Sequence, residues 1–323
     1  MMRQLRFYIP YVVGAMTLWA VLLATSDALD TVMAAWPAAL AMVLGSFIGG
    51  ASAEGGGAVA FPIFTLLLKI PPPSARNFSF AIQSFGMVSA SMLILGRGIP
   101  IEARAVFFPA VGGIVGLVLG TYGVVPLLDP VWTKLFFVSL WAAFGVGLWR
   151  ANARTHRTVA RALPDVLRRG DVATLVMAGF AGGVVTSIFG NGIDLLTFCV
   201  LTLWYGIDER VATPTSVVLM SVLTLCGTFL HVGIMQDFGT TEYHALLASA
   251  PVVVIFGPIG AYVITRWKRL SIARLLYTIM AVQLAGAIYV LGATIEHLLF
   301  CGVVLAVGST IMVWMSKKTV TTR

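Results

Sequence analysis

Charged residues are scarce in this chain. Asp, Glu, Lys and Arg make up only 11% of the sequence, whereas soluble domains carry about 25%. The mean hydropathy is +0.95, so the composition excludes an ordinary soluble domain. The net charge of +8 does not indicate a nucleic-acid-binding surface either, because the cations lie in short loops between apolar runs.

Paired cysteines, metal motifs and nucleotide motifs are also lacking. Cys199, Cys226 and Cys301 lie in apolar runs without paired spacing, which supports neither a disulfide framework nor a zinc site. No H-E-x-x-H motif and no Walker sequence is present. We therefore expect no cofactor, no metal and no enzymatic activity. An intramembrane hydrolase stays open as an alternative, because "GNGID" (190–194) is close to the G-x-G-D of aspartyl intramembrane proteases. An isoleucine intervenes, however, and no paired aspartate motif accompanies it.

Long uncharged runs dominate the rest of the sequence. Each has roughly the 18 to 25 residues that cross a hydrocarbon core about 30 Å thick, and they do not alternate in polarity as barrel strands do. We therefore predict an all-α polytopic membrane protein. An uncleaved first helix is favoured, because no convincing cleavage site follows the first run. The runs are Phe7–Ala24, Phe78–Leu95, Ala105–Leu128, Val211–Met235, Ala245–Thr265, Leu275–Ile295 and Leu298–Ser316, with Leu135–Trp149 as a shorter one.

Two further stretches are too long to be single spans. Thr31–Leu68 contains one charge, Glu54, and Val172–Ile207 contains one charge, Asp194. As continuous helices they would each extend roughly 55 Å, nearly twice the core thickness. Each is therefore expected to be two helical pieces joined at its glycine cluster, so that the chain returns to the side where it began. Whether the pieces are re-entrant hairpins or full crossings stays open.

The distribution of basic residues supports this double-back topology. With the N-terminus inside, all of the 21 lysines and arginines except Lys69, Arg76 and Lys134 fall on the inner side. Treating each stretch as a single crossing would instead place the basic 150–169 loop outside, against the positive-inside rule. We therefore predict a multi-pass protein of the bacterial inner membrane with both termini in the cytoplasm.

The two long stretches also begin two similar halves. "GSFIGGASAEGGG" (45–57) resembles "GFAGGVVTSIFGNG" (179–192), and Arg76 lies opposite Arg210 at an offset of 134 residues. Each half then continues with three spans, and the halves start on opposite sides, which predicts an inverted-topology repeat. The expected units are an N-terminal transmembrane helix (1–30), a first repeat (31–149), a basic cytoplasmic linker (150–171), a second repeat (172–295), and a C-terminal transmembrane helix with its tail (296–323).

Inverted repeats with broken helices are typical of secondary transporters. A break in a helix leaves backbone N–H and C=O groups free to bind a substrate in a water-filled cavity. The N-termini of the half-helices favour anions. An ionisable residue at membrane depth is costly, which suggests that it has a function. Local capping and helix packing are the structural alternatives for these polar side chains. The candidate substrate-binding residues are Ser52, Gly55, Gly56, Gly57, Asn77, Ser79, Gln83, Thr186, Asn191, Gly192, Thr213, Ser216, Arg76 and Arg210, and the candidate coupling residues are Glu54, Asp194 and His231.

Several of these motifs resemble one transporter family. The glycines of "GSFIGG" (45–50), the triplet Gly55–Gly57 with Pro62 after it, and the "SARNFSF" (74–80) and "RVATPTS" (210–216) segments are similar to those of the TauE/SafE anion exporters. The resemblance extends from Ala34 to Gly292 and implies a bacterial inner-membrane permease for sulfite, organosulfonates or related organic anions. The chain departs from the family pattern at Glu54, and its second motif reads "FGNGID" rather than a glycine triplet.

These observations together predict a secondary active transporter that exports a small anion by alternating access, with protons as the hypothesised coupling ion. An anion channel is the alternative, because two opposed broken segments can also line a pore. The expected partners are the small anionic substrate, the lipid bilayer and protons, with no nucleic acid. The sequence is compatible with a homodimer but does not specify one.

Overall fold

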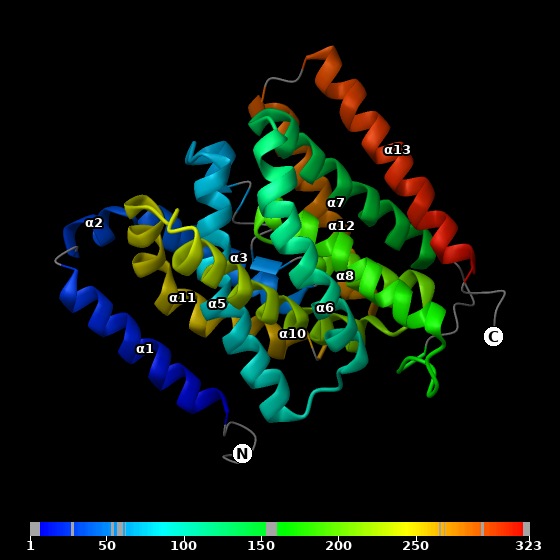
Figure 1. Ribbon diagram of the computed structural model, residues 1–323, viewed down its shortest axis with the longest axis horizontal. Helices are drawn as coiled ribbons and strands as arrows, with labels where there is room; N and C mark the ends of the chain where they lie inside the picture. Colours follow the sequence, from blue (N-terminus) through cyan, green and yellow to red (C-terminus); the bar gives the residue numbers. More distant parts are fainter. Residues whose placement is uncertain are drawn as a thin grey trace.

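The computed structural model describes residues 7–26, 29–52, 55–56, 61, 63–152, 160–264, 266–267, 269–291 and 294–318. Within these ranges the chain forms helices joined by loops and no β-sheet (Figure 1). The α-helices are α1 (Tyr8–Thr25), α2 (Leu29–Ala34), α3 (Trp36–Ala51), α5 (Pro72–Arg97), α6 (Arg104–Leu119), α7 (Pro130–Asn152), α8 (Arg169–Phe189), α9 (Ile193–Cys199), α10 (Glu209–Thr228), α11 (Thr240–Ile264), α12 (Arg269–Leu291) and α13 (Ile295–Lys318). Shorter segments are the π-helical η2 (Ile63–Leu67), η3 (Gly120–Val124), η5 (Val200–Trp204) and η6 (Phe229–Ile234) and the 3₁₀ turn η4 (Val125–Leu127).

Eight helices in the described part of the chain are long and apolar enough to cross a bilayer, which confirms a polytopic helical membrane protein. They cover Tyr8–Thr25, Pro72–Arg97, Arg104–Leu127, Val131–Arg150, Arg169–Phe189, Glu209–Ile234, Thr240–Ile264 and Ile295–Met315. Three apolar helices are shorter, namely Trp36–Ala51, Ile193–Trp204 and Arg274–Val290. The expected span Leu275–Ile295 therefore corresponds to a shorter apolar helix within α12.

The second long stretch is broken at its glycines, as the sequence predicted. Helix α8 ends at Phe189 and is capped by Gly190, which has a left-handed φ of 80°, and α9 begins at Ile193. The end of the stretch lies beside its beginning, because the Tyr205 hydroxyl donates a hydrogen bond of 3.0 Å to Asp171 Oδ1. This contact is what a return to the starting side requires. In the first stretch, α3 ends at Ala51, just before the glycine triplet.

Glycines allow several helices to cross in close backbone contact. A Cβ at Gly50 of α3 would overlap the carbonyl of Gly257 in α11, and one at Gly183 of α8 would overlap the carbonyl of Gly113 in α6. Lipid supplies no hydrophobic force between helices, so small residues that let two backbones approach are the usual basis of such packing. The crossings join α3 to α11 and α8 to α6, helices that are distant in the sequence.

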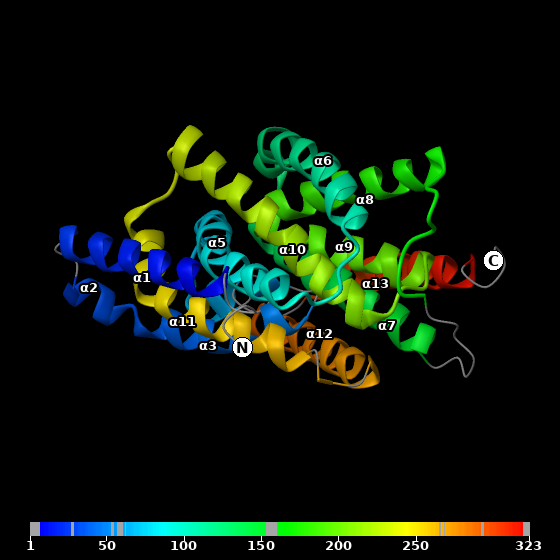
Figure 2. The same cartoon turned by 90° about the horizontal axis from the view of Figure 1, so that it is seen from below.

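Helices α5 and α10 pack against each other in the middle of the molecule. Helix α5 also packs against α11, and α10 against α6, while α7 contacts α12 and α13. Helices α1 and α13 lie at opposite ends of the long axis, as both views show (Figures 1 and 2). Their large apolar side chains, Val13 and Val307 among them, are exposed, as expected for lipid-facing helices.

Candidate functional site

The two broken segments meet beside α5. Gly55 of the first break has a φ of 71°, and a Cβ on it would lie 2.6 Å from Asp194 Oδ2 and 3.0 Å from Gln83 Oε1. Gly190 of the second break is equally close to α5, because a Cβ there would lie 2.6 Å from Ser79 Cβ. Both positions need glycine, since an L side chain fits neither the positive φ nor the space. We call Gly55, Ser79, Gln83, Gly190 and Asp194 the junction.

The orientation of the Gln83 amide follows from its neighbours. Its Nε2 donates to Ser79 Oγ at 2.8 Å, to the Ser79 carbonyl at 3.1 Å, and to the Gly190 carbonyl at 2.8 Å. The Ser79 and Gly190 carbonyls can only accept, so they require the nitrogen on that side. This places Oε1 against Gly55, which Asp194 Oδ2 also faces. Gln83 is buried, and its Oε1 accepts no hydrogen bond from the described residues. The i, i+4 spacing of Ser79 and Gln83 thus puts both on one face, as expected.

Asp194 is completely buried. Its Oδ1 accepts hydrogen bonds from the backbone N–H of Gly192 at 3.0 Å and of Leu195 at 2.9 Å. Its Oδ2 faces Gly55 and has no hydrogen-bond partner among the described residues. No ion pair joins the carboxyl to a described lysine, arginine or histidine. An isolated charge at this depth is costly, and within the described residues the hydrogen bonds to Oδ1 are what offset that cost.

The backbone N–H groups at the second break donate hydrogen bonds to neighbouring side chains. Those of Gly192 and Leu195 donate to Asp194, and that of Ile193 donates to Thr186 Oγ1 at 2.9 Å. The sequence-based expectation of amide donors available to an anion is therefore wrong for these three groups in this conformation. Buried N–H groups need acceptors, and the carboxyl and hydroxyl side chains supply them.

Other predicted residues lie at or near the breaks. Asn191 is buried, with its Cβ 3.6 Å from a Cβ built at Gly55, so it adjoins the junction. Ser52 is buried at the C-terminal end of α3. Gly56 packs against α3, because a Cβ at Gly49 would overlap its backbone nitrogen. Glu54 and Gly57 lie outside the described residues.

Thr213 and Ser216 are one turn apart on α10 and are both buried. Their hydroxyl groups have no hydrogen-bond partner in the part of the chain that the structure describes. Helix α10 packs against both α5 and α9, the helices that carry Gln83 and Asp194. Hydroxyl groups without an acceptor in a buried position can donate to a ligand.

Arg76, Asn77 and His231 form a separate group, which we call the Arg76 cluster, around Asp237. The Arg76 guanidinium donates to Asn77 Oδ1 at 2.9 and 3.0 Å and lies 3.6 Å from Asp237 Oδ2. His231 Nδ1 is 2.9 Å from Asp237 Oδ1, and its ring stacks on Phe80. Arg76 also lines a cavity of about 50 Å³ with Pro72, Pro73, Val125, Leu128, Thr133 and Ile188.

Arg210 belongs to neither group. It lies in the first turn of α10 with an exposed side chain, and its backbone N–H donates to Asp208 at 2.8 Å. The matching of Arg76 with Arg210 in the sequence therefore does not extend to their surroundings. The partner of Arg76 is Asp237, which the sequence reasoning missed. The available signal was Arg76 itself, because a buried guanidinium requires an anionic neighbour.

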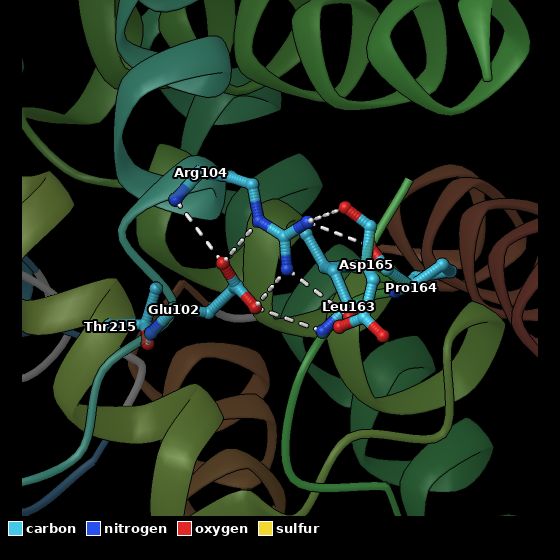
Figure 3. Close-up of polar contacts among 6 residues, drawn as sticks. All are labelled: Glu102, Arg104, Leu163, Pro164, Asp165 and Thr215. Atoms are coloured by element: carbon cyan, nitrogen blue, oxygen red, sulfur yellow. Dashed lines mark hydrogen bonds and ion pairs between the residues drawn. The ribbon is translucent and has the colours of Figure 1, made fainter. Parts of the chain in front are cut away.

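A second feature missed from the sequence is a clasp between Arg104 and the linker before α8 (Figure 3). Arg104 forms a bidentate ion pair with Glu102, at 2.9 and 3.0 Å, and also donates to the carbonyls of Leu163, Pro164 and Asp165. Glu102 Oε2 accepts the Leu163 N–H at 2.9 Å, while the Glu102 N–H donates to Thr215 Oγ1 at 2.9 Å. The clasp thus ties the linker to the α5–α6 loop and to α10.

The ionisation of Glu102 reflects these contacts. Burial alone would raise its pKa, but the hydrogen bonds from Arg104 and Leu163 and the charge of Arg104 outweigh burial, so the pKa of Glu102 lies below its usual value. Glu102 is therefore a carboxylate near neutral pH and holds the linker in place.

Comparison with known proteins identifies the family. The family model described as "Sulfite exporter TauE/SafE" matches residues 38–289, which include the glycines of both breaks and the whole junction. No curated protein matches the chain, and no solved structure does. The matched range covers more than half of the sequence, and the eight apolar helices agree with a membrane transporter. The chain therefore belongs to the TauE/SafE family of membrane transporters.

Proposed function

We propose that this protein is a secondary active transporter that exports a small oxyanion, such as sulfite, an organosulfonate or a related organic acid, across the bacterial inner membrane. The observation that carries the proposal is the junction, where the two broken segments and α5 bring the buried polar side chains of Gln83 and Asp194 against Gly55. Broken segments meeting inside a helical membrane protein are the usual setting of a transport site. The family description points to the class of anion.

The helix contacts favour alternating access over an open pore. Helix α6 packs on α8, and α11 packs on α3, so each predicted repeat holds the broken segment of the other. The junction residues Ser79, Gln83 and Asp194 are buried, which means that a substrate needs a rearrangement to reach them. Two related halves that rock around a central site supply such a movement. With the predicted topology, both termini lie in the cytoplasm.

Buried hydroxyl donors suit the substrate. Thr213 and Ser216 on α10 offer two such groups, and hydrogen bonds from neutral donors can hold an oxyanion without adding a fixed positive charge. The Arg76 cluster provides a guanidinium beside a small cavity, which would attract an anion toward the central helices.

Proton coupling follows from the charge of Asp194. A buried carboxylate would repel an approaching anion, whereas its protonated form would not. A proton on Asp194 would therefore accompany occupancy of the site by the substrate. The outward concentration gradient of the anion, and not the inward proton gradient, would then drive export. Glu54 is the other candidate from the sequence, and its neighbour Gly55 lies at the junction.

The proposed function is tested with purified protein in proteoliposomes. Sulfite, sulfoacetate, taurine and simple carboxylates are offered with and without a pH gradient, and empty liposomes provide the background. We expect saturable flux of at least one of these anions, with a response to the gradient. The absence of flux for all of them, with wild-type protein shown to be folded, would contradict the anion assignment. The variant Glu54→Gln should retain the gradient response if Asp194 carries the proton.

A further inference from the structure

Two unpartnered acceptors face the same place in the junction. Gln83 Oε1 and Asp194 Oδ2 are both buried, both lie against Gly55, and neither accepts a hydrogen bond from a described residue. Two oxygen atoms that can only accept repel each other, and in an apolar interior water does not relieve the repulsion. Within the described part of the chain the pair therefore lacks a donor.

The amide of Gln83 cannot supply that donor by turning over. Its Nε2 is committed to Ser79 and to the Gly190 carbonyl, and a reversed amide would set its oxygen against both carbonyls. Gln83 also has no remaining N–H for a substrate. The sequence predicted that Gln83 binds the anion, but this fits the structure poorly. The amide has only an oxygen lone pair to offer, and a lone pair repels an anion.

A proton on Asp194 supplies the donor with the fewest requirements. A metal cation would need several more oxygen ligands, since hard cations commonly take about six or more, and the described residues contain no cluster of three or more acidic, histidine or cysteine side chains. No described charged residue forms an ion pair with Asp194. The α-helices that pack on α9, together with α5, carry their charged residues near their ends, namely Arg104, Arg169, Asp171, Glu209, Arg210, Arg76 and Arg97. The titratable thiols are Cys226 on α10 and Cys199 on α9 itself.

We propose that Asp194 Oδ2 binds the coupling proton and donates it in a hydrogen bond to Gln83 Oε1. The proton is taken up from water onto the carboxylate and is returned to water on release, so no other group changes its charge. When Asp194 is protonated, its hydrogen bond to Gln83 joins α5 to the second break beside Gly55. When Asp194 is deprotonated, the two oxygen atoms repel each other, which favours separation of α5 from the second break. This inference deepens the proposed function and rests on it, because it assigns Gln83 to the proton rather than to the anion.

The direct test measures the protonated carboxyl without any transport. Difference infrared spectroscopy of the purified full-length protein in liposomes, recorded while the pH is changed, reports the C=O stretch of a protonated carboxylic acid. We expect one such band to be absent in Asp194→Asn, and to move to a higher frequency in Gln83→Leu because its hydrogen bond is lost. The matched control is Ser89→Ala, a buried serine on the same helix that donates to the Val254 carbonyl. A band that is unchanged in Asp194→Asn, or that does not move in Gln83→Leu, would overturn the proposal.

Flux measurements then separate this inference from the proposed function. In Asp194→Asn the amide can still donate to Gln83, so we expect exchange of the anion to continue while the response to a pH gradient is lost. In Gln83→Glu a second carboxyl shares the site, and the pH at which flux is half-maximal should rise by about one unit or more. Flux that follows a sodium gradient at constant pH, and not a pH gradient, would contradict the assignment to a proton. If no anion is transported but the infrared band behaves as expected, the proposed function fails while the proton site stands.

Discussion

The side-chain amide of Gln83 donates a 2.8 Å hydrogen bond to the carbonyl of Gly190, 107 residues further along the chain. This bond joins α5 to the point where α8 ends and the second break begins. It depends on close approach of the two backbones, which the absence of a side chain at Gly190 permits. The contact places a helix of the first predicted repeat directly against the break of the second.

Replacing Gly190 tests this approach. In Gly190→Ala the new Cβ meets Ser79 Cβ at 2.6 Å, and the backbone also keeps a φ of 80°. Gly98→Ala is the matched control, because Gly98 has a φ of 65° but nothing within 4 Å of its Cβ position. We expect both variants to lose about 1–2 kcal/mol from the left-handed backbone, and Gly190→Ala to lose more and to transport less. Equal thermal stability and equal flux in the two variants would show that crowding at the junction is unimportant.

The glycine crossings predict a second contrast. Gly50→Ala places a methyl group against the Gly257 carbonyl in α11, so we expect a loss of about 1–3 kcal/mol from overpacking. Gly286→Ala in α12 meets nothing within 4 Å, and alanine is the better helix former. That variant should be unchanged or slightly more stable. Thermal unfolding in detergent, followed by intrinsic fluorescence, measures both, and a Gly50→Ala protein as stable as Gly286→Ala would refute the packing assignment.

The clasp makes stability depend on pH. The pKa of Glu102 is lower in the folded protein than in the unfolded chain, so its contribution is complete above the unfolded value of about 4.3 and is lost as the pH falls through the folded value. The stability advantage of wild type over Glu102→Gln should be constant near neutral pH and shrink below about pH 4. Asp165→Asn is the control, because the Asp165 backbone carbonyl accepts the hydrogen bond from Arg104 and its carboxylate adds a Coulombic attraction to Arg104 without contacting Glu102. A difference between wild type and Glu102→Gln that grows on acidification would contradict this account.

The Arg76 cluster predicts unequal effects of its two charged members. Asp237→Asn leaves the buried Arg76 guanidinium without its anion, and we expect a loss of about 1–3 kcal/mol. Arg76→Met should cost less, because the Asp237 side chain is 35% exposed and keeps its contact with His231. Chemical unfolding in detergent compares the two variants. A larger loss in Arg76→Met would mean that Asp237 relies on Arg76 more than its exposure indicates.

The sequence predicted the apolar helices and the second break because both are local properties. Runs of uncharged residues determine the spans, and the glycines at 190 and 192 determine where α8 stops. The use of the amides after that break could not be predicted, because it depends on how the Asp194 and Thr186 side chains fold back. Contacts that join distant positions, such as Arg76 with Asp237 and Arg104 with Leu163, leave no periodic pattern.

The candidate site was predicted in part for the same reason. Gln83 and Ser79 were found because their spacing places them on one helix face, and Asp194 because a carboxyl in an apolar run is unusual. Their closeness to Gly55 depends on the packing of α5 and the two breaks. Arg210 was predicted because it lies opposite Arg76 in the second repeat. Its side chain is exposed because it lies in the first turn of α10.

Counterflow of isotopically labelled sulfite tests the central claim of alternating access most directly. Proteoliposomes are loaded with a high concentration of unlabelled sulfite and diluted into a trace of labelled sulfite, with no pH gradient or membrane potential. A carrier whose site faces one side at a time predicts a transient accumulation of label above its equilibrium level, absent in empty liposomes. Label that only approaches equilibrium, at a rate independent of the internal sulfite, would contradict the account and indicate a channel.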